Sequence, residues 1–277
     1  MQVIESVAEF KAMRREIAGS VGLVPTMGYL HDGHLELARR ARAENDVVAV
    51  SIFVNPTQFG PSEDFARYPS DPERDLALLR GVGADLVLLP PVADVYPPGF
   101  STYVDVLGVT ERLEGAARPG HFRGVATVVA KLFNIVAPTR AYFGQKDAQQ
   151  VVVIKKMAKD LDMNLDIVVV NTVREADGLA MSSRNVYLTT EQRRAAPVLY
   201  RSLELARRLR AEGEADVGRI KAAMTILIAT EPSVEVEYIS VAHLETLEEL
   251  DVASGATLVS LAARLGRTRL IDNVLLG

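Results

Sequence analysis

The sequence contains no cysteine among its 277 residues. The chain therefore cannot form disulfides, use a thiol as a nucleophile or bind a metal through cysteine. Long apolar runs are missing too, since no stretch approaches the ~20 residues that a membrane-spanning helix needs, and we expect no membrane partner. The segment from Met1 to Phe10 carries no apolar core flanked by basic residues. We therefore expect no signal peptide and a cytoplasmic location.

The chain also lacks a strong net charge. Its formal charge is -5, with a sequence pI near 5.5, and this balance argues against a nucleic-acid partner. Hydrophobic residues make up 48% and charged residues 24%, which is typical of a globular protein. We find no internal repeat, low-complexity tract or long linker. The length suffices for one large domain and one smaller domain, each with its own core.

The first part of the chain alternates between apolar runs and amphipathic segments. Strands are expected over 21–24, 46–54, 85–89, 141–143 and 165–170, with an edge strand over 102–106. Helices are expected over 5–18, after 34, from Asp71-Pro72 to about 82, over 125–136 and over 147–161. This alternation predicts an α/β fold with a Rossmann-like parallel sheet and helices on both faces.

The pattern changes near residue 172. A turn over 176–178 and a polar loop over 181–185 come first, and Thr189 with Gln192 forms the capping-box signature of a long helix. A second helix is expected over 214–229, and strands over 234–241, 256–261 and 268–275. We therefore predict a Rossmann-like domain over 1–172 and a smaller C-terminal α+β lid domain with an antiparallel sheet over 173–277.

The stretch from Pro25 to His34 reads as a strand-to-helix turn. Gly28 and Gly33 allow close approach of backbone to a ligand, and Asp32 or a neighbour is expected to cap the helix. Helix N-termini that follow parallel strands favour phosphate groups. His31 and His34 could donate to phosphate oxygens whose charge grows during nucleotidyl transfer. A surface histidine pair is the competing interpretation, and a zinc site is disfavoured because no third ligand lies nearby in sequence.

Three further polar loops, over 55–60, 144–150 and 173–185, follow strands or lie at the domain junction. Each could be an ordinary surface loop when taken alone. The carboxyl ends of parallel strands meet at one edge of a sheet, where open α/β sheets bind ligands. Taken together, loops that supply donors, a lysine and an arginine indicate a nucleotide pocket.

Several motifs resemble the pantothenate synthetase family. They are PTMGYLHDGH at 25, FVNPTQF at 53, RPGHFRGV at 118, YFGQKDAQQ at 142, DGLAMSSRN at 177 and RLIDN at 269, in the order of that family. The HxGH signature of the wider nucleotidyl-transferase superfamily reads here as His31 to His34. Its mobile lysine-serine signature appears as the variant Met181 to Arg184. The resemblance runs nearly end to end.

The resemblance implies ATP-dependent condensation of (R)-pantoate with β-alanine to pantothenate, AMP and pyrophosphate through a pantoyl adenylate. It implies Mg²⁺ with ATP, and it favours a homodimer through the large domain, for which 104–106 offers a candidate contact. It assigns catalytic roles to His34, His31, Lys146 and Arg184, with His34 as proton donor, and places pantoate on Gln58 and Gln150. Gln149 is the adjacent alternative to Gln150, and Asp75 is a candidate metal ligand.

The residues that the resemblance places in contact with ATP all lie in the loops that carry these motifs or next to them. They are Met27, Gly28, Tyr29, Leu30, His31, Asp32, Gly33, His34, Gly144, Gln145, Lys146, Asp147, Val173, Met181, Ser182, Ser183 and Arg184. Asp147 could engage the ribose or Lys146. The roles of Arg118 and His121 stay open. Gln145 and Ala148 depart from residues common in the family at positions where the chemistry requires no particular group.

Two other interpretations are compatible with the HxGH turn. A related nucleotidyl transferase acting on a phosphorylated alcohol would share the turn but would need extra cationic residues rather than the two glutamines. A non-enzymatic nucleotide-binding module would be expected to lose charge-neutralising groups. His31, His34, Lys146 and Arg184 are all present.

Overall fold

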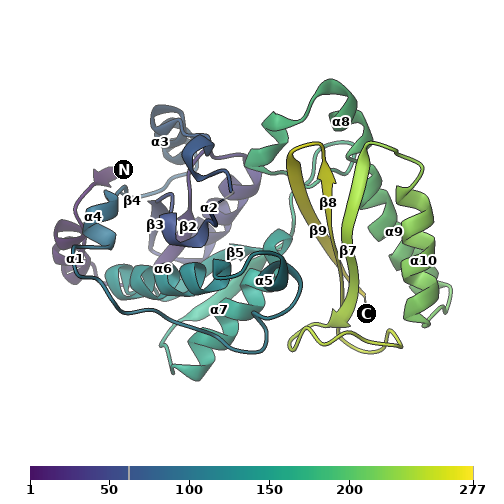
Figure 1. Ribbon diagram of the computed structural model, residues 1–277. Coiled ribbons are helices and arrows are strands. Elements are labelled where there is room, and N and C mark those ends of the chain that lie inside the picture. The colour runs from purple at the N-terminus through teal and green to yellow at the C-terminus, as the bar shows by residue number, and fades with distance from the viewer. Residues whose placement is uncertain (62, 277) are drawn as a thin grey trace. The chain divides into compact units, whose positions relative to one another are not determined.

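The computed structural model describes residues 1–61 and 63–276 (Figure 1). The chain forms two compact units. The first comprises Met1–Gly144 and Val153–Asn171, and the second comprises Gln145–Val152 and Thr172–Gly277. The sequence pattern predicts a boundary at 172–173 and carries no signal that 145–152 belongs with the second unit. Asn273 donates to the main chain of this segment at Gln145 and Lys146.

The first unit contains a six-stranded sheet in the order β1-β4-β3-β2-β5-β6, and all its strands are parallel. The strands are β1 (Gln2–Ile4), β2 (Val21–Thr26), β3 (Val47–Ile52), β4 (Leu86–Leu88), β5 (Arg140–Gly144) and β6 (Asp166–Val170). The strand order reverses between β2 and β5, which in open α/β sheets is the place of the ligand crevice. The predicted Rossmann-like parallel sheet is confirmed.

Helices cover both faces of this sheet. The longer ones are α1 (Val7–Glu16), α2 (Asp32–Glu44), α3 (Pro72–Gly81), α6 (His121–Val136) and α7 (Ala148–Asp160), of which residues 153–160 belong to this unit. Leu35, Ala38 and Ala41 of α2 share a core with Leu79 of α3 and Val50 of β3. On the other face α1 and α6 pack against each other (Figure 1).

Shorter elements connect these helices and strands. They are the helices α4 (Val92–Val95) and α5 (Leu113–Ala117) and the 3₁₀ turns Pro56–Gln58, Phe65–Arg67 and Gln145–Asp147. The helix expected from residue 125 begins at His121, directly after Gly120 in the left-handed region at φ 84°. The chain thus passes from the motif loop into α6 without an intervening segment.

The expected edge strand over 102–106 is wrong. Residues 101–107 form no regular element, because the Val104 N–H donates at 3.0 Å to the Thr127 hydroxyl of α6 and not to a neighbouring strand. One edge of the sheet is instead β1, which pairs with β4 in register from Gln2 to Ile4. Three residues are too short a run for a periodic pattern, so the sequence carries no signal for β1.

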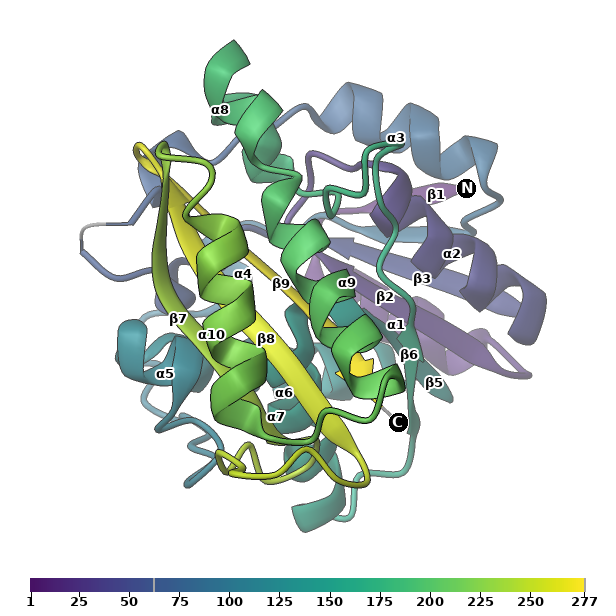
Figure 2. The same cartoon turned by 90° about the vertical axis from the view of Figure 1, so that its right-hand side faces the viewer.

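The second unit is built on an antiparallel sheet. Its strands β7 (Val234–His243), β8 (Thr257–Leu265) and β9 (Thr268–Leu276) pair in that order. The helices α9 (Val198–Ala211) and α10 (Val217–Ile228) cover one face of this sheet (Figure 2). Leu199 and Leu203 of α9 and Ile220 and Met224 of α10 pack in one core with Val259 of β8. The predicted α+β architecture with an antiparallel sheet is confirmed.

The long helix expected after Thr189 is divided. Thr189 and Gln192 form the predicted capping box at the start of α8 (Thr190–Ala195), but Pro197 separates α8 from α9. Proline lacks the N–H that would continue the helix and clashes with the preceding turn. A 3₁₀ turn, Ser183–Tyr187, precedes α8. Among the described helices none is long and apolar enough to cross a membrane.

Candidate active site

The turn between β2 and α2 contains consecutive residues in the left-handed region of backbone conformation, Gly28 at φ 81° and Tyr29 at φ 51°. A Cβ at Gly28 would lie 3.0 Å from Ile52 Cγ2 and 3.1 Å from a carboxylate oxygen of Asp75. Glycine at this position therefore satisfies both the backbone conformation and the close approach. The Gly28 N–H donates to the Thr26 hydroxyl at 3.2 Å, which stabilises the bend where β2 ends.

His31 is the N-cap of α2, the neighbour of Asp32 that the sequence analysis left open. Its Nδ1 accepts the Gly33 N–H at 3.1 Å, and the Nδ1 of His34 accepts the His31 N–H at 3.3 Å. A ring nitrogen that accepts a main-chain N–H carries no proton, so in the neutral rings Nε2 is the protonated nitrogen. The ring centroids lie 4.0 Å apart. The capping bonds thus orient two Nε2–H donors side by side at a helix N-terminus.

Asp75 supports this turn from α3. Its two carboxylate oxygens accept the Tyr29 N–H and the Leu30 N–H, each at 2.7 Å, and its side chain is only 1% exposed. Burial raises the pKa of the Asp75 carboxyl, while the two backbone hydrogen bonds oppose that rise. The strained conformation of Tyr29 is therefore held in place by a buried acceptor 46 residues away.

Gln58 is buried at the end of the 3₁₀ turn that follows β3. Its Oε1 accepts the Asn55 Nδ2–H at 3.0 Å, and its Nε2 lies 3.3 Å from the sulfur of Met27. Asn55 also donates to the Gly124 carbonyl at 3.1 Å, which ties the 55–60 loop to α6. The side-chain amide of Gln58 is thus fixed in one orientation beside the turn over 27–34, the histidine turn.

Arg118 and His121 hold the main chain of Gln58. Arg118 donates through Nε and Nη2 to the two carboxylate oxygens of Glu63, at 2.7 and 2.6 Å. The His121 Nδ1–H donates to the Gln58 carbonyl at 2.8 Å, so its Nε2 accepts from Arg118 Nη1 at 3.1 Å. Burial and the neighbouring Arg118 charge lower the pKa of His121 to about 4. His121 is therefore a neutral structural support near pH 7.

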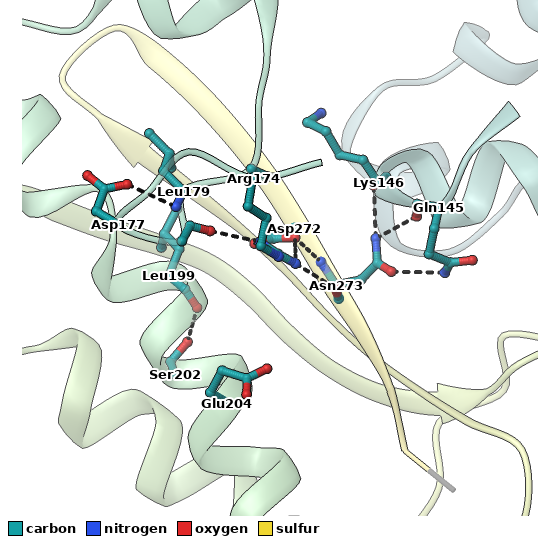
Figure 3. A network of polar contacts seen from close by, with 12 residues as sticks. Gln145, Lys146, Arg174, Asp177, Leu179, Leu199, Ser202, Glu204, Asp272 and Asn273 are labelled. Carbon is teal, nitrogen blue, oxygen red and sulfur yellow. Dashed lines mark hydrogen bonds and ion pairs between the residues drawn. The ribbon is translucent and has the colours of Figure 1, made fainter. Parts of the chain in front are cut away.

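Lys146 lies in the 3₁₀ turn Gln145–Asp147 of the second unit, whose first residue directly follows Gly144 at the end of β5. The Lys146 Nζ is 3.6 Å from Asp147 Oδ1. The carbonyl oxygens of Gln145 and Lys146 each accept from the Asn273 Nδ2 group at 2.9 Å (Figure 3). A strand residue from the end of the chain therefore fixes the backbone of the lysine turn.

The loop from Val173 to Arg184 folds back on itself. The Met181 N–H donates to the Val173 carbonyl at 3.0 Å, and Arg174 pairs with Ala180 in an antiparallel bridge. Ser182 caps the following 3₁₀ turn by accepting the Arg184 N–H at 3.3 Å. The hydroxyl and guanidinium groups over 182–184 are thus carried by an ordered loop.

The two adjacent glutamines of α7 differ in burial. Gln149 is 6% exposed, whereas Gln150 is half-buried. Gln150 is therefore the more accessible of the two amides. Both belong to the segment 145–152 of the second unit.

The structure brings together, within the first unit, the predicted residues of the 27–34 turn with Gln58 and Asp75. Within the second unit it assembles 145–147 and 173–184 around β9. Sequence reasoning assigned no role to Asn55, Asp272 or Asn273. The available signal is the polar pair Asp272-Asn273 in the otherwise apolar run from Leu270 to Leu275, and both side chains are buried.

No group of three or more histidine, aspartate or glutamate side chains that could hold a metal ion occurs within residues 1–61 and 63–276. Asp75, the candidate metal ligand that the family resemblance implies, directs both carboxylate oxygens at main-chain N–H groups. The described residues therefore build no protein cage for Mg²⁺.

Comparison with known proteins shows a family model and relatives that match this sequence over almost its whole length. Residues 2–275 match the family model described as pantoate-beta-alanine ligase. A pantothenate synthetase of Roseiflexus castenholzii is 59% identical over 276 residues, covering 100% of this chain and 99% of the relative. One of Herpetosiphon aurantiacus is 58% identical over 277 residues, with 100% of both chains covered.

Solved structures agree with these sequence matches. The crystal structure of pantothenate synthetase from Thermus thermophilus matches with a TM-score of 0.95 and 50% identity, over 99% of both chains. A pantoate-beta-alanine ligase from Francisella tularensis, complexed with beta-gamma ATP and beta-alanine, matches with a TM-score of 0.82 and 35% identity over 99% of this chain and 97% of the other. The chain thus has the same fold as these enzymes over 99% of its length.

Proposed function

The chain belongs to the pantoate–β-alanine ligase family, and from this premise we infer that it condenses (R)-pantoate with β-alanine at the expense of ATP. The products are pantothenate, AMP and pyrophosphate. The alternative of a transferase acting on a phosphorylated alcohol is not favoured, because full-length relatives at 59% and 58% identity are pantothenate synthetases.

The chemistry needs two steps because a carboxylate is a poor electrophile. In the first, a pantoate carboxylate oxygen attacks the α-phosphorus of ATP, the bond to the bridging oxygen breaks, and pyrophosphate leaves. In the second, the β-alanine amine attacks the acyl carbon of the pantoyl adenylate, AMP leaves, and the amine nitrogen loses a proton. Negative charge grows on the phosphate oxygens in the first step, so positioned donors accelerate it.

We propose that His31 and His34 supply two of these donors through Nε2–H. The capping bonds at Nδ1 support this role because they set the tautomer before substrate binds. Lys146 and Arg184 supply cationic donors, and the Ser182 and Ser183 hydroxyls supply neutral ones. Donors held in place in advance require no reorganisation when the charge develops.

Gln58 and Gln150 are proposed to bind the hydroxyl groups of pantoate, with Gln58 also near β-alanine. An amide offers both a donor and an acceptor, which suits hydroxyls without adding charge. The fixed orientation of the Gln58 amide supports this assignment. The main chain of 27–34, of 144–147 and of Val173 is proposed to contact the nucleotide, together with Met181.

Mg²⁺ is proposed to enter with ATP, bound by phosphate oxygens and water. This proposal fits the absence of a three-ligand carboxylate cluster among the described residues, because Mg²⁺ commonly keeps several waters and binds substrate phosphates. When bound, the ion would neutralise phosphate charge. For Asp75 we propose support of the histidine turn in place of metal coordination.

The homodimer, the cytoplasmic location and a lid role for the second unit stay predictions. Of the residues expected to form the dimer contact over 104–106, Val106 is only 8% exposed within the single chain, so its side chain can contribute little to that contact. Val104 is partly exposed and remains available for such a contact.

The observation that carries this function is the histidine turn, where the Nδ1 atoms of both histidines accept main-chain N–H groups at the start of α2 and leave Nε2 as the donor of each neutral ring. The test is pantoate-dependent exchange of labelled pyrophosphate into ATP, with Mg²⁺ present and β-alanine absent. We expect exchange, because the first step is complete and reversible without the amine. Adding β-alanine should then give pantothenate and AMP in equal amounts.

Exchange without pantoate, or no exchange while ATP still binds, would contradict this function. A panel of other hydroxy acids and phosphorylated alcohols serves as the specificity control, and the ligase predicts activity with (R)-pantoate well above the rest of that panel.

A further inference from the structure

Adjacent residues of β9, Asp272 and Asn273, anchor the parts of the second unit that carry the proposed donors. Asn273 is 3% exposed, and its amide bonds to the turn Gln145–Asp147. Asp272 is 4% exposed and bonds to Arg174, which leads into the 174–184 loop (Figure 3). Nothing in the chemistry of ligation requires these residues, so their burial calls for another explanation.

All the hydrogen-bonding capacity of the Asn273 Nδ2 group is used. It donates to the Gln145 carbonyl and to the Lys146 carbonyl, both at 2.9 Å, while Oδ1 accepts the Gln145 Nε2–H at 3.0 Å. An aspartate here would place an oxygen against two carbonyl oxygens, and an alanine would remove the donor that both carbonyls share. Asparagine is therefore the residue whose size and donors match this position.

The two carbonyls belong to the peptide groups on either side of the Lys146 Cα. Each peptide group is planar, so fixing both planes fixes the dihedral angles of Lys146 and the direction of its Cα–Cβ bond. A lysine side chain has high rotamer entropy, and a mobile base would add to the positions that its ammonium group samples. Asn273 thereby restricts where the Lys146 ammonium group can lie.

Asp272 and Arg174 fix the part of β9 that presents Asn273. Arg174 donates to both Asp272 carboxylate oxygens, at 2.6 and 3.0 Å, and its guanidinium lies 3.9 Å from the Tyr200 ring centroid. Arg174 also donates to the Gly178 carbonyl at 3.1 Å. Burial raises the pKa of the Asp272 carboxyl, and the Arg174 hydrogen bonds oppose this rise. The pair joins β9 to the turn at the start of the 174–184 loop.

We propose that Asn273 is a positioning residue for ligation, acting through Lys146 by holding the two peptide groups that flank it. This proposal rests on the proposed function, in which Lys146 stabilises charge on the phosphates. Asn273 itself touches neither substrate nor nucleotide in this role.

The test is a double-mutant cycle of Asn273→Ala and Lys146→Ala, measured by pantoate-dependent pyrophosphate exchange. Misplacement of a catalytic group by about 1 Å can cost on the order of 100-fold, so we expect Asn273→Ala to slow exchange roughly 10- to 100-fold. In the Lys146→Ala background the same substitution should change the rate by no more than about twofold. A purely structural role would slow both backgrounds equally, and that additivity would overturn the proposal.

Asn273→Asp is the second variant, because it keeps the side-chain shape while it replaces the Nδ2 donors by a carboxylate oxygen that repels the two carbonyl oxygens. Leu275→Ala is the matched control on the same strand, where the side chain is 41% exposed, and it should leave exchange unchanged. Thermal unfolding establishes that each variant is folded. The pantoate KM should stay constant in both Asn273 variants while kcat falls; a selective rise in KM would contradict action through Lys146.

Hydrogen–deuterium exchange of the peptide covering 145–150 gives a readout independent of activity. We expect faster exchange there in both Asn273 variants than in wild type and Leu275→Ala. Unchanged protection would overturn the anchoring role. If wild type shows no pantoate-dependent pyrophosphate exchange, the proposed function fails, while the deuterium measurement still reports whether Asn273 holds the turn.

Discussion

The turns that carry His34 and Lys146 are stabilised in different ways. In the histidine turn the first and fourth residues cap each other through bonds that span two and three residues of sequence. In the lysine turn the main chain is held by Asn273, 127 and 128 residues away. A local capping motif can form as soon as its helix forms, whereas the lysine turn needs the completed β9. The first turn is therefore specified by neighbouring residues and the second by tertiary structure.

The largest effect is expected at the lysine turn itself. Lys146→Ala should slow pyrophosphate exchange by about 100- to 1000-fold, because one preorganised electrostatic donor to a developing charge contributes that much. Stability should change little, since the ion pair of the ammonium group with Asp147 at 3.6 Å is partly exposed, and such pairs contribute little to stability. Exchange assays and thermal unfolding check both parts, and a near-normal exchange rate would remove Lys146 from the mechanism.

His34 allows the capping and the chemical role to be separated. His34→Ala should slow exchange by roughly 100-fold and lower the free energy of unfolding by about 1 kcal/mol through loss of the cap. His34→Asn supplies an oxygen near the Nδ1 position but no donor at Nε2. We expect it to recover stability without recovering exchange; recovery of both in urea unfolding and exchange assays would show that capping alone matters.

Asp75 tests how far the histidine turn depends on a distant residue. Asp75→Ala leaves the Tyr29 and Leu30 N–H groups without their acceptor, and we expect a loss of about 2–3 kcal/mol in the free energy of unfolding. Exchange should fall by roughly 10-fold as the turn loosens. Urea unfolding measures the first effect. If stability is unchanged and only the Mg²⁺ dependence of exchange shifts, Asp75 is a metal ligand after all.

The smallest effect is expected from the acid sensitivity of His121, whose ring donates to the Gln58 carbonyl in the unit that carries the histidine turn. The pKa of His121 is about 4 in the folded chain and near 6.5 when unfolded, so the unfolded state binds the proton first as pH falls. Stability from this group is complete above pH 6.5 and falls by roughly 1.4 kcal/mol by pH 5.5. His121→Asn, which keeps a donor for the Gln58 carbonyl, should show a shallower loss in urea unfolding between pH 7 and 5.5. Equal slopes would contradict the lowered pKa of His121.

Local patterns predicted the parallel sheet, the strand-turn-helix around His31 and the capping box at Thr189. Each depends on residues within a few positions of one another. The short strand β1 and the irregular course of 101–107 were not predictable in this way. The first has too few residues for a pattern, and the second is decided by a bond from Val104 to Thr127 of another element.

The features of the candidate site can likewise be separated into those set by neighbouring residues and those set by distant ones. The sequence by itself determined which donors are present and that a helix begins within the 25–34 turn. The structure decided that His31 is the N-cap of this helix, and thereby which ring nitrogen of His31 and His34 carries the proton. Only the tertiary structure decided that Asp75 supports the histidine turn and that Asn273 holds the backbone of Lys146. The reason is physical: a buried polar group must find a partner, and when no neighbour in sequence can supply one, the partner comes from wherever the folded chain brings a matching donor or acceptor.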